Sequence, residues 1–158
     1  MDTLDFLEEY REDNRIEAKI AQCGLPMSLW ETYSAFANTL GGVILLGVKE
    51  MEDKSLRSVP LFDPQELVDE FWDMVNDPNV VSANILSPED VTIVRSGGND
   101  IVVIFVPRAN FRQRPVYIGQ DLYRGAYYRC GEGDCRLPRQ EIDAMLCDRD
   151  DPAPLSGL

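Results

Sequence analysis

Residues 36–50 read Phe-Ala-Asn-Thr-Leu-Gly-Gly-Val-Ile-Leu-Leu-Gly-Val-Lys-Glu, and a helical pattern gives way to a strand pattern at the pair of glycines. Upstream of the pair, apolar residues recur every three or four positions, as on one face of a helix: Leu29, Tyr33, Phe36, Ala37 and Leu40. Gly41 can adopt the left-handed conformation that closes a helix, and Gly42 lets another segment approach the backbone closely. Residues 43–48 contain no polar side chain, so we predict a central strand covered on both faces.

Two further patterns flank this helix and strand. Apolar and polar residues alternate over residues 15–20, which predicts a strand with one covered face and one polar face that Glu17 and Lys19 share. Residues 63–75 begin with Asp-Pro and continue with apolar residues at helical spacing, which predicts an amphipathic helix with Trp72 in the core.

The remaining patterns complete an α+β domain. Strand-like runs occur at residues 80–86, 91–94 and 101–106, and the last two are joined by a glycine-rich turn typical of an antiparallel hairpin. Residues 138–147 have the spacing of a final helix. We therefore predict a mixed β-sheet packed with three to four helices in one domain over residues 1–147, followed by an acidic, proline-containing tail or linker over residues 148–158.

Composition limits the function of this domain. The chain has 158 residues, is 44% hydrophobic and carries a net charge of -13, so a nucleic-acid partner requires a local basic patch. We expect no membrane partner and a cytoplasmic location, because there is no long apolar run and the first residues are acidic. The chain has no histidine, and its four cysteines lack zinc-ligand spacing, so we expect reduced thiols and no structural zinc.

Positive charge is concentrated in one segment. Residues 95–139 hold eight arginines against four acidic residues, a local net charge of +4. Tyrosines are interleaved with these arginines, a combination suited to stacking on bases and pairing with phosphates. The candidate nucleic-acid contacts are Arg112, Arg114, Tyr117, Arg124, Tyr128 and Arg129. The alternative is a tyrosine-rich strand pair whose arginines balance the acidic remainder of the fold.

The order of several short motifs resembles that of the Schlafen AlbA-2 domain, also called the divergent AAA-4 domain. The motifs are Glu12 with Glu17-Ala18-Lys19, Ala35-Phe36-Ala37-Asn38-Thr39 with Gly41-Gly42 and Gly47-Val48, residues 101–107, Arg114-Pro115-Val116-Tyr117, Tyr128-Arg129-Cys130-Gly131 and Glu141-Ile142. The resemblance spans about residues 8–146 and implies an α+β fold with a mixed sheet. It also implies a DNA-binding module of the kind found at the N-terminus of bacterial transcriptional regulators. Its structural motif residues are Asn38, Thr39, Gly41, Gly42 and Gly47.

The same resemblance suggests an active site. In the animal Schlafen branch, three carboxylates form a metal-dependent RNA-cleaving triad, and Glu12, Glu17 and Glu50 occupy the matching positions. Three carboxylates could hold Mg²⁺ or Mn²⁺ and activate water. This chain departs from the pattern by a glutamate as third acid, by Ala18 before the lysine, and by having one lobe where the nuclease has two. The alternative is that Glu17 pairs with Lys19 on an exposed strand face and that Glu12 lies in a turn.

Three functions follow from these patterns. The first is a regulatory module that binds DNA or RNA as a homodimer and needs no cofactor. The second is a metal-dependent endoribonuclease that uses the carboxylate triad with Mg²⁺ or Mn²⁺. The third is a protein-interaction module whose acidic surface contacts a basic partner.

Overall fold

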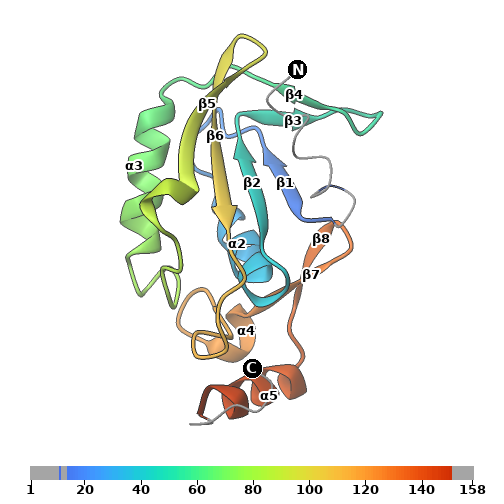
Figure 1. Cartoon of the computed structure of the whole chain (residues 1–158), viewed down its shortest axis with the longest axis vertical. Helices are drawn as coiled ribbons and strands as arrows, with labels where there is room; N and C mark the ends of the chain where they lie inside the picture. Colours follow the sequence, from blue (N-terminus) through green and yellow to red (C-terminus); the bar gives the residue numbers. More distant parts are fainter. Residues whose placement is uncertain (1–10, 12–13, 151–158) are drawn as a thin grey trace.

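The computed structural model describes residue 11 and residues 14–150. The elements follow one another as β1 (Ile16–Lys19), α2 (Leu29–Asn38), β2 (Gly42–Leu46), β3 (Val48–Glu50), β4 (Leu56–Ser58), α3 (Pro64–Val75), the 3-10 helix η2 (Pro88–Asp90), β5 (Val91–Ser96), β6 (Asn99–Val106), α4 (Leu122–Gly125), β7 (Tyr127–Cys130), β8 (Gly133–Arg136) and α5 (Arg139–Asp150) (Figure 1).

The main sheet is mixed, as predicted. Its strand order is β1-β2-β6-β5, with β1 parallel to β2 and the other neighbours antiparallel. The predicted hairpin of β5 and β6 is confirmed. Two small hairpins, β3–β4 and β7–β8, lie beside the sheet, and with the described helices they make an α+β domain (Figure 1).

The glycine pair joins α2 to β2 as the sequence predicts. Gly41 has φ +76°, and its N–H donates to the Phe36 carbonyl at 2.7 Å, which closes the helix. A Cβ on Gly41 would lie 2.8 Å from the Val106 carbonyl oxygen, and a Cβ on Gly42 would lie 2.7 Å from the Phe36 ring. Both positions therefore need glycine, because the helix, β2 and the end of β6 meet there.

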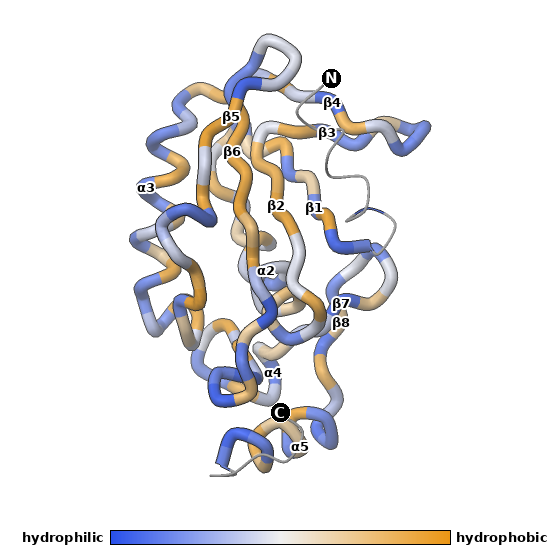
Figure 2. The backbone as a smooth tube through the Cα atoms, in the orientation of Figure 1, coloured by the Kyte–Doolittle hydropathy of each residue, from blue (hydrophilic) through white to orange (hydrophobic). Residues whose placement is uncertain are grey.

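The apolar core occupies both faces of β2 and β6. On one face, Ile44 and Ile104 pack with the aromatic side chains of α2 and α3, including a stack of Trp30 on Phe71 at 5.2 Å between ring centroids. Trp72 is half-buried at the margin of this cluster. The other face carries a second cluster that includes Val43 and is likewise buried. Figure 2 shows the two central strands as largely apolar and the outer turns of α3 as hydrophilic.

Two of the predicted strands differ from the structure. Gly47, with φ +86°, ends β2, so the single strand expected over 43–48 is two strands, the second of which pairs with β4. The strand expected over 80–86 is wrong: that segment makes one isolated bridge, from Val81 to Ile118. Beyond this bridge the backbone bonds to the Tyr33 hydroxyl, which donates to the Ala83 carbonyl at 2.9 Å and accepts from the Ile85 N–H at 3.1 Å.

The final helix extends beyond its expected end at residue 147. Helix α5 runs from Arg139 to Asp150, and so includes the first residues of the expected tail. Arg149 donates to the carbonyls of Gln113, Arg114 and Pro115 at 2.9, 3.0 and 3.2 Å, which joins the last turn of the helix to the preceding loop. No described helix is long and apolar enough to cross a membrane.

Candidate functional site

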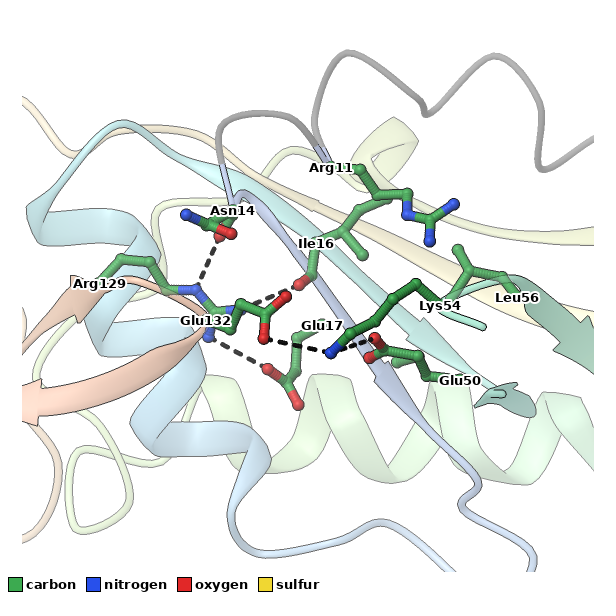
Figure 3. Close-up of a pocket in the computed structure, with 10 residues that line it drawn as sticks. Arg11, Asn14, Ile16, Glu17, Glu50, Lys54, Leu56, Arg129 and Glu132 are labelled. Atoms are coloured by element: carbon green, nitrogen blue, oxygen red, sulfur yellow. Dashed lines mark hydrogen bonds and ion pairs between the residues drawn. The ribbon is translucent and has the colours of Figure 1, made fainter. Parts of the chain in front are cut away.

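A charged pocket of about 210 Å³ lies beside β1 and the two small hairpins (Figure 3). Its charged lining residues are Arg11, Glu17, Glu50, Lys54, Arg129 and Glu132, and we call it the carboxylate pocket. Glu17 comes from β1 and Glu50 from β3, so the structure brings these two candidate residues together. Glu12 lies outside the residues that the structure describes.

Arg129 forms one wall of the carboxylate pocket, and its side chain is only 6% exposed. Its Nε donates to the Asn14 carbonyl at 2.8 Å, and its Nη2 donates to the Ile16 carbonyl at 2.9 Å. Its Nη1 donates to both Glu17 Oε1 at 3.1 Å and Asp134 Oδ1 at 2.9 Å. Every nitrogen of this guanidinium is thus engaged inside the protein, where it joins β7 to β1.

Two lysines also form ion pairs with carboxylates of the pocket. Lys54 Nζ lies 3.6 Å from both Glu50 Oε1 and Glu132 Oε2, and so links the turns of the two small hairpins (Figure 3). Lys19 Nζ lies 3.6 Å from Glu17 Oε2, as expected from their shared strand face. The side chains of Glu17 and Lys19 are only 24% and 18% exposed. Arg129 lies against Glu17, and Lys19 Nζ also donates to Ser28 Oγ at 3.0 Å.

The described side chains of the carboxylate pocket do not fit a divalent metal. Within residues 11 and 14–150, no group of three or more His, Cys, Asp or Glu side chains is placed to hold a metal ion. Arg129 and Lys54 already lie against the carboxylates that would be the ligands. A cation would have to displace these side chains, so we derive no metal-dependent step from this pocket.

The Asn-Thr pair at the end of α2 holds β7 in place. The buried Asn38 amide donates to the carbonyls of Val116 and Tyr127, each at 2.9 Å, and its oxygen accepts from the Val116 N–H at 2.7 Å. Thr39 Oγ1 accepts from the Arg129 N–H at 3.0 Å. These two residues therefore fix the backbone that carries Arg129 into the pocket.

A second candidate surface is the segment 107–114 that follows β6, which we call the basic loop. It carries Arg108 and Arg112, both exposed, and the half-buried Arg114. The Arg112 guanidinium lies 4.9 Å from the centre of the Phe111 ring. Burial and the neighbouring charge of Arg108 lower the pKa of Arg114 from its ordinary value, against a smaller opposite effect of the Asp148 carboxylate. In the described part of the chain, none of the three arginines forms an ion pair with a carboxylate.

The basic loop has a fixed shape. The Ala109 N–H donates to the Ala37 carbonyl at 2.8 Å, which attaches the loop to α2. Asn110 Oδ1 accepts from the N–H groups of Arg112 and Gln113 at 2.9 and 3.1 Å, and so forms a turn at its centre. With Arg149 bound to the carbonyls at its end, the loop presents its arginines from an ordered backbone.

The other candidate contacts do not join this loop in one exposed face. Tyr117 and Tyr128 are half-buried and pack against the apolar cluster of Ala126, Leu137 and Ile142. Arg124, on α4, is 80% exposed, and its Nε lies 3.6 Å from Asp121 Oδ2.

Several residues that shape these sites had no distinctive sequence pattern. Glu132 lies in the β7–β8 turn and Asp134 in β8, in a short polar stretch without a distinctive pattern. Their partners, Lys54 and Arg129, are known only from the three-dimensional contacts. Arg108 belongs to the arginine-rich segment, but it precedes the stretch in which tyrosines and arginines are interleaved, so the sequence did not single it out. Lys54 follows Glu50 at a spacing of four residues, which is informative on a helix but not in a hairpin.

These features define an α+β domain in which a helix and a central strand meet at a glycine pair, with a charged pocket beside the edge strand. The sequence model of the family described as Schlafen, AlbA_2 matches residues 2–138, so the chain belongs to this family. No curated protein matches the chain.

Solved structures that are similar to this chain include two from bacteria. The solution NMR structure of the N-terminal domain of a Nitrosomonas europaea protein related to the ATP-dependent DNA helicase RecG is 32% identical, with a TM-score of 0.60, and the match covers 86% of this chain and 92% of that one. The crystal structure of a Corynebacterium diphtheriae protein is 18% identical, with a TM-score of 0.57, and shares the fold over 92% of this chain and 26% of that one.

Proposed function

We propose that this domain binds DNA or RNA by phosphate contacts from the basic loop, and that it serves as the contact module of a cytoplasmic regulator. The observation that carries the proposal is the group of Arg108, Arg112 and Arg114, held on an ordered backbone without a carboxylate ion pair among the described residues. Arg108 and Arg114 carry like charges that repel each other, and a polyanion relieves that repulsion. Family membership and the RecG-related neighbour agree with a nucleic-acid role.

The contact set differs from the one expected from sequence. Arg129 is left out because its guanidinium is engaged internally, and Tyr117 and Tyr128 are left out because they pack in an apolar cluster. Arg108 is added because it is exposed and acts electrostatically on Arg114. Since the whole chain carries a net charge of -13, binding should be weak and should depend strongly on salt.

The test is the salt dependence of binding, measured by fluorescence anisotropy with labelled single-stranded DNA, single-stranded RNA and duplex DNA. If Arg108 and Arg112 each contact a phosphate, the double variant Arg108→Gln/Arg112→Gln should reduce the log-log salt slope by about 2 and weaken binding to every sequence tested. The matched control, Arg57→Gln/Arg95→Gln, changes net charge equally at exposed positions of β4 and β5. Equal losses in both variants would refute a contact at the basic loop.

A second copy of the domain is also part of the proposal. Strand β5 is an edge of the main sheet, and its Ile93 side chain is 38% exposed. An edge strand with an exposed apolar side chain can pair with the same strand of another copy across a two-fold axis. We propose a homodimer formed in this way, which would present two basic loops to one nucleic acid.

A further inference from the structure

The strongest unassigned surface is acidic and lies along α3. Residues 58–94 contain eight acidic residues and no lysine or arginine. On α3, the exposed acids Glu66, Asp69, Glu70 and Asp73 form one stripe at helical spacing, while the opposite face packs into the core. This surface repels phosphate, so the proposed nucleic-acid function does not use it.

A groove of about 410 Å³ lies beside the start of this stripe, between the loop 21–24 and the first turns of α3. Its apolar lining includes Phe62 and Leu67, and its acidic lining includes Asp63, Glu66 and Glu70. In the part of the chain that the structure describes, none of these three acids forms an ion pair with a basic side chain.

Phe62 is the unusual residue of the groove. Its side chain is 96% exposed, immediately before the Asp63 cap of α3, where it contributes almost nothing to the core. The loop across the groove is held by Gln22, whose Nε2 donates to the Pro60 carbonyl at 2.9 Å. The exposed ring offers an apolar contact beside the groove, and the acids on the rim offer ion pairs to a basic side chain.

We propose that this groove docks a basic amphipathic segment of a partner protein. Lysine or arginine side chains of the partner would pair with Asp63, Glu66 and Glu70, and an apolar side chain would pack on the exposed Phe62 ring. The charge complementarity selects a basic occupant, and the exposed ring selects one that also carries an apolar anchor.

The experiment measures binding of a fluorescein-labelled synthetic peptide with one leucine-rich face and lysines on the other, in comparison with the same peptide carrying glutamate in place of every lysine. We expect the lysine peptide to bind and the glutamate peptide not to bind. Phe62→Ser should weaken binding by about tenfold or more, because an aromatic anchor is a typical hot spot.

A matched pair of variants separates docking in the groove from general charge attraction. Glu66→Gln/Glu70→Gln removes two groove acids, and Asp69→Asn/Asp73→Asn removes two acids of the same helix that do not line the groove. The first pair should weaken binding severalfold more than the second. Equal effects of the two pairs, or an unchanged affinity in Phe62→Ser, would overturn the proposal, with circular dichroism confirming that each variant is folded.

Discussion

Substitution of Arg129 should show whether this arginine stabilises the fold from inside or contacts nucleic acid at the surface. The change Arg129→Met keeps a long apolar stem but removes the guanidinium, with its bonds to the Asn14 and Ile16 carbonyls and to the carboxylates of Glu17 and Asp134. It also removes the contact with the Phe36 ring, 5.0 Å from the guanidinium carbon.

The size of the effect follows from the burial of these groups. Asp134 and Glu17 are only 13% and 24% exposed, and they would face each other without the cation that both now contact. Removal of one partner from a buried ion pair costs about 3–5 kcal/mol. For a domain of this size that corresponds to a fall in melting temperature of about 6–20 °C.

The matched control is Arg124→Met, which also removes one arginine that the sequence placed among the nucleic-acid contacts. Arg124 is 80% exposed, and its ion pair with Asp121 is long at 3.6 Å, so its loss should cost at most about 1 kcal/mol. Urea unfolding followed by circular dichroism measures both values. A cost for Arg129→Met no larger than that for Arg124→Met would refute the claim that the Arg129 guanidinium stabilises the fold by joining β7 to β1.

A double-mutant cycle tests the assigned partner. Glu17→Gln alone should cost about 1 kcal/mol, because the amide oxygen still accepts from Arg129 and the carboxylate is partly exposed. In the Arg129→Met background, the same change should cost less or be stabilising, because Glu17 then repels Asp134 and keeps only its ion pair with Lys19. Additive effects would show that Glu17 and Arg129 do not interact.

Three further predictions concern the glycine turn, pH and assembly. Gly41→Ala should be more destabilising than Gly98→Ala by about 1–3 kcal/mol, because both glycines have positive φ but only Gly41 would place a Cβ against backbone; urea unfolding of both variants checks this. Burial raises the pKa of Tyr33 from 10.0 to about 12, so the stability due to its neutral form is complete below pH 10 and is lost as pH rises from 10 to about 12. Tyr33→Phe should remove this loss, as measured by unfolding at several alkaline pH values. Sedimentation equilibrium should give twice 17.9 kDa, and a monomer at high concentration would exclude the proposed dimer.

The fold could be predicted where it depends on local chemistry. The helix, the glycine pair and the buried strand after it follow from periodicity and from the conformational freedom of Gly41, and the structure confirms them. The segment 80–86 was mispredicted because its apolar residues suggest a strand, whereas the hydroxyl of Tyr33, about fifty residues away in the sequence, bonds its backbone.

The candidate site was predictable only in part. The shared strand face of Glu17 and Lys19 was visible in the alternation of β1, and their ion pair confirms it. The burial of Arg129 was not visible, because it depends on contacts with Asn14, Ile16 and Glu17, which precede it by 115, 113 and 112 residues. Composition alone cannot distinguish an arginine that binds phosphate from one that binds buried carboxylates.

The central claim is that nucleic acid contacts the basic loop and not the carboxylate pocket. A titration of the ¹⁵N-labelled protein with single-stranded DNA at low salt, followed by NMR, tests it most directly. We predict that the amide signals of residues 107–114 and of the last turn of α5 shift progressively, while those of residues 50–54 and 129–134 stay unchanged. Shifts confined to residues 50–54 and 129–134, or no shifts at low salt, would contradict the account.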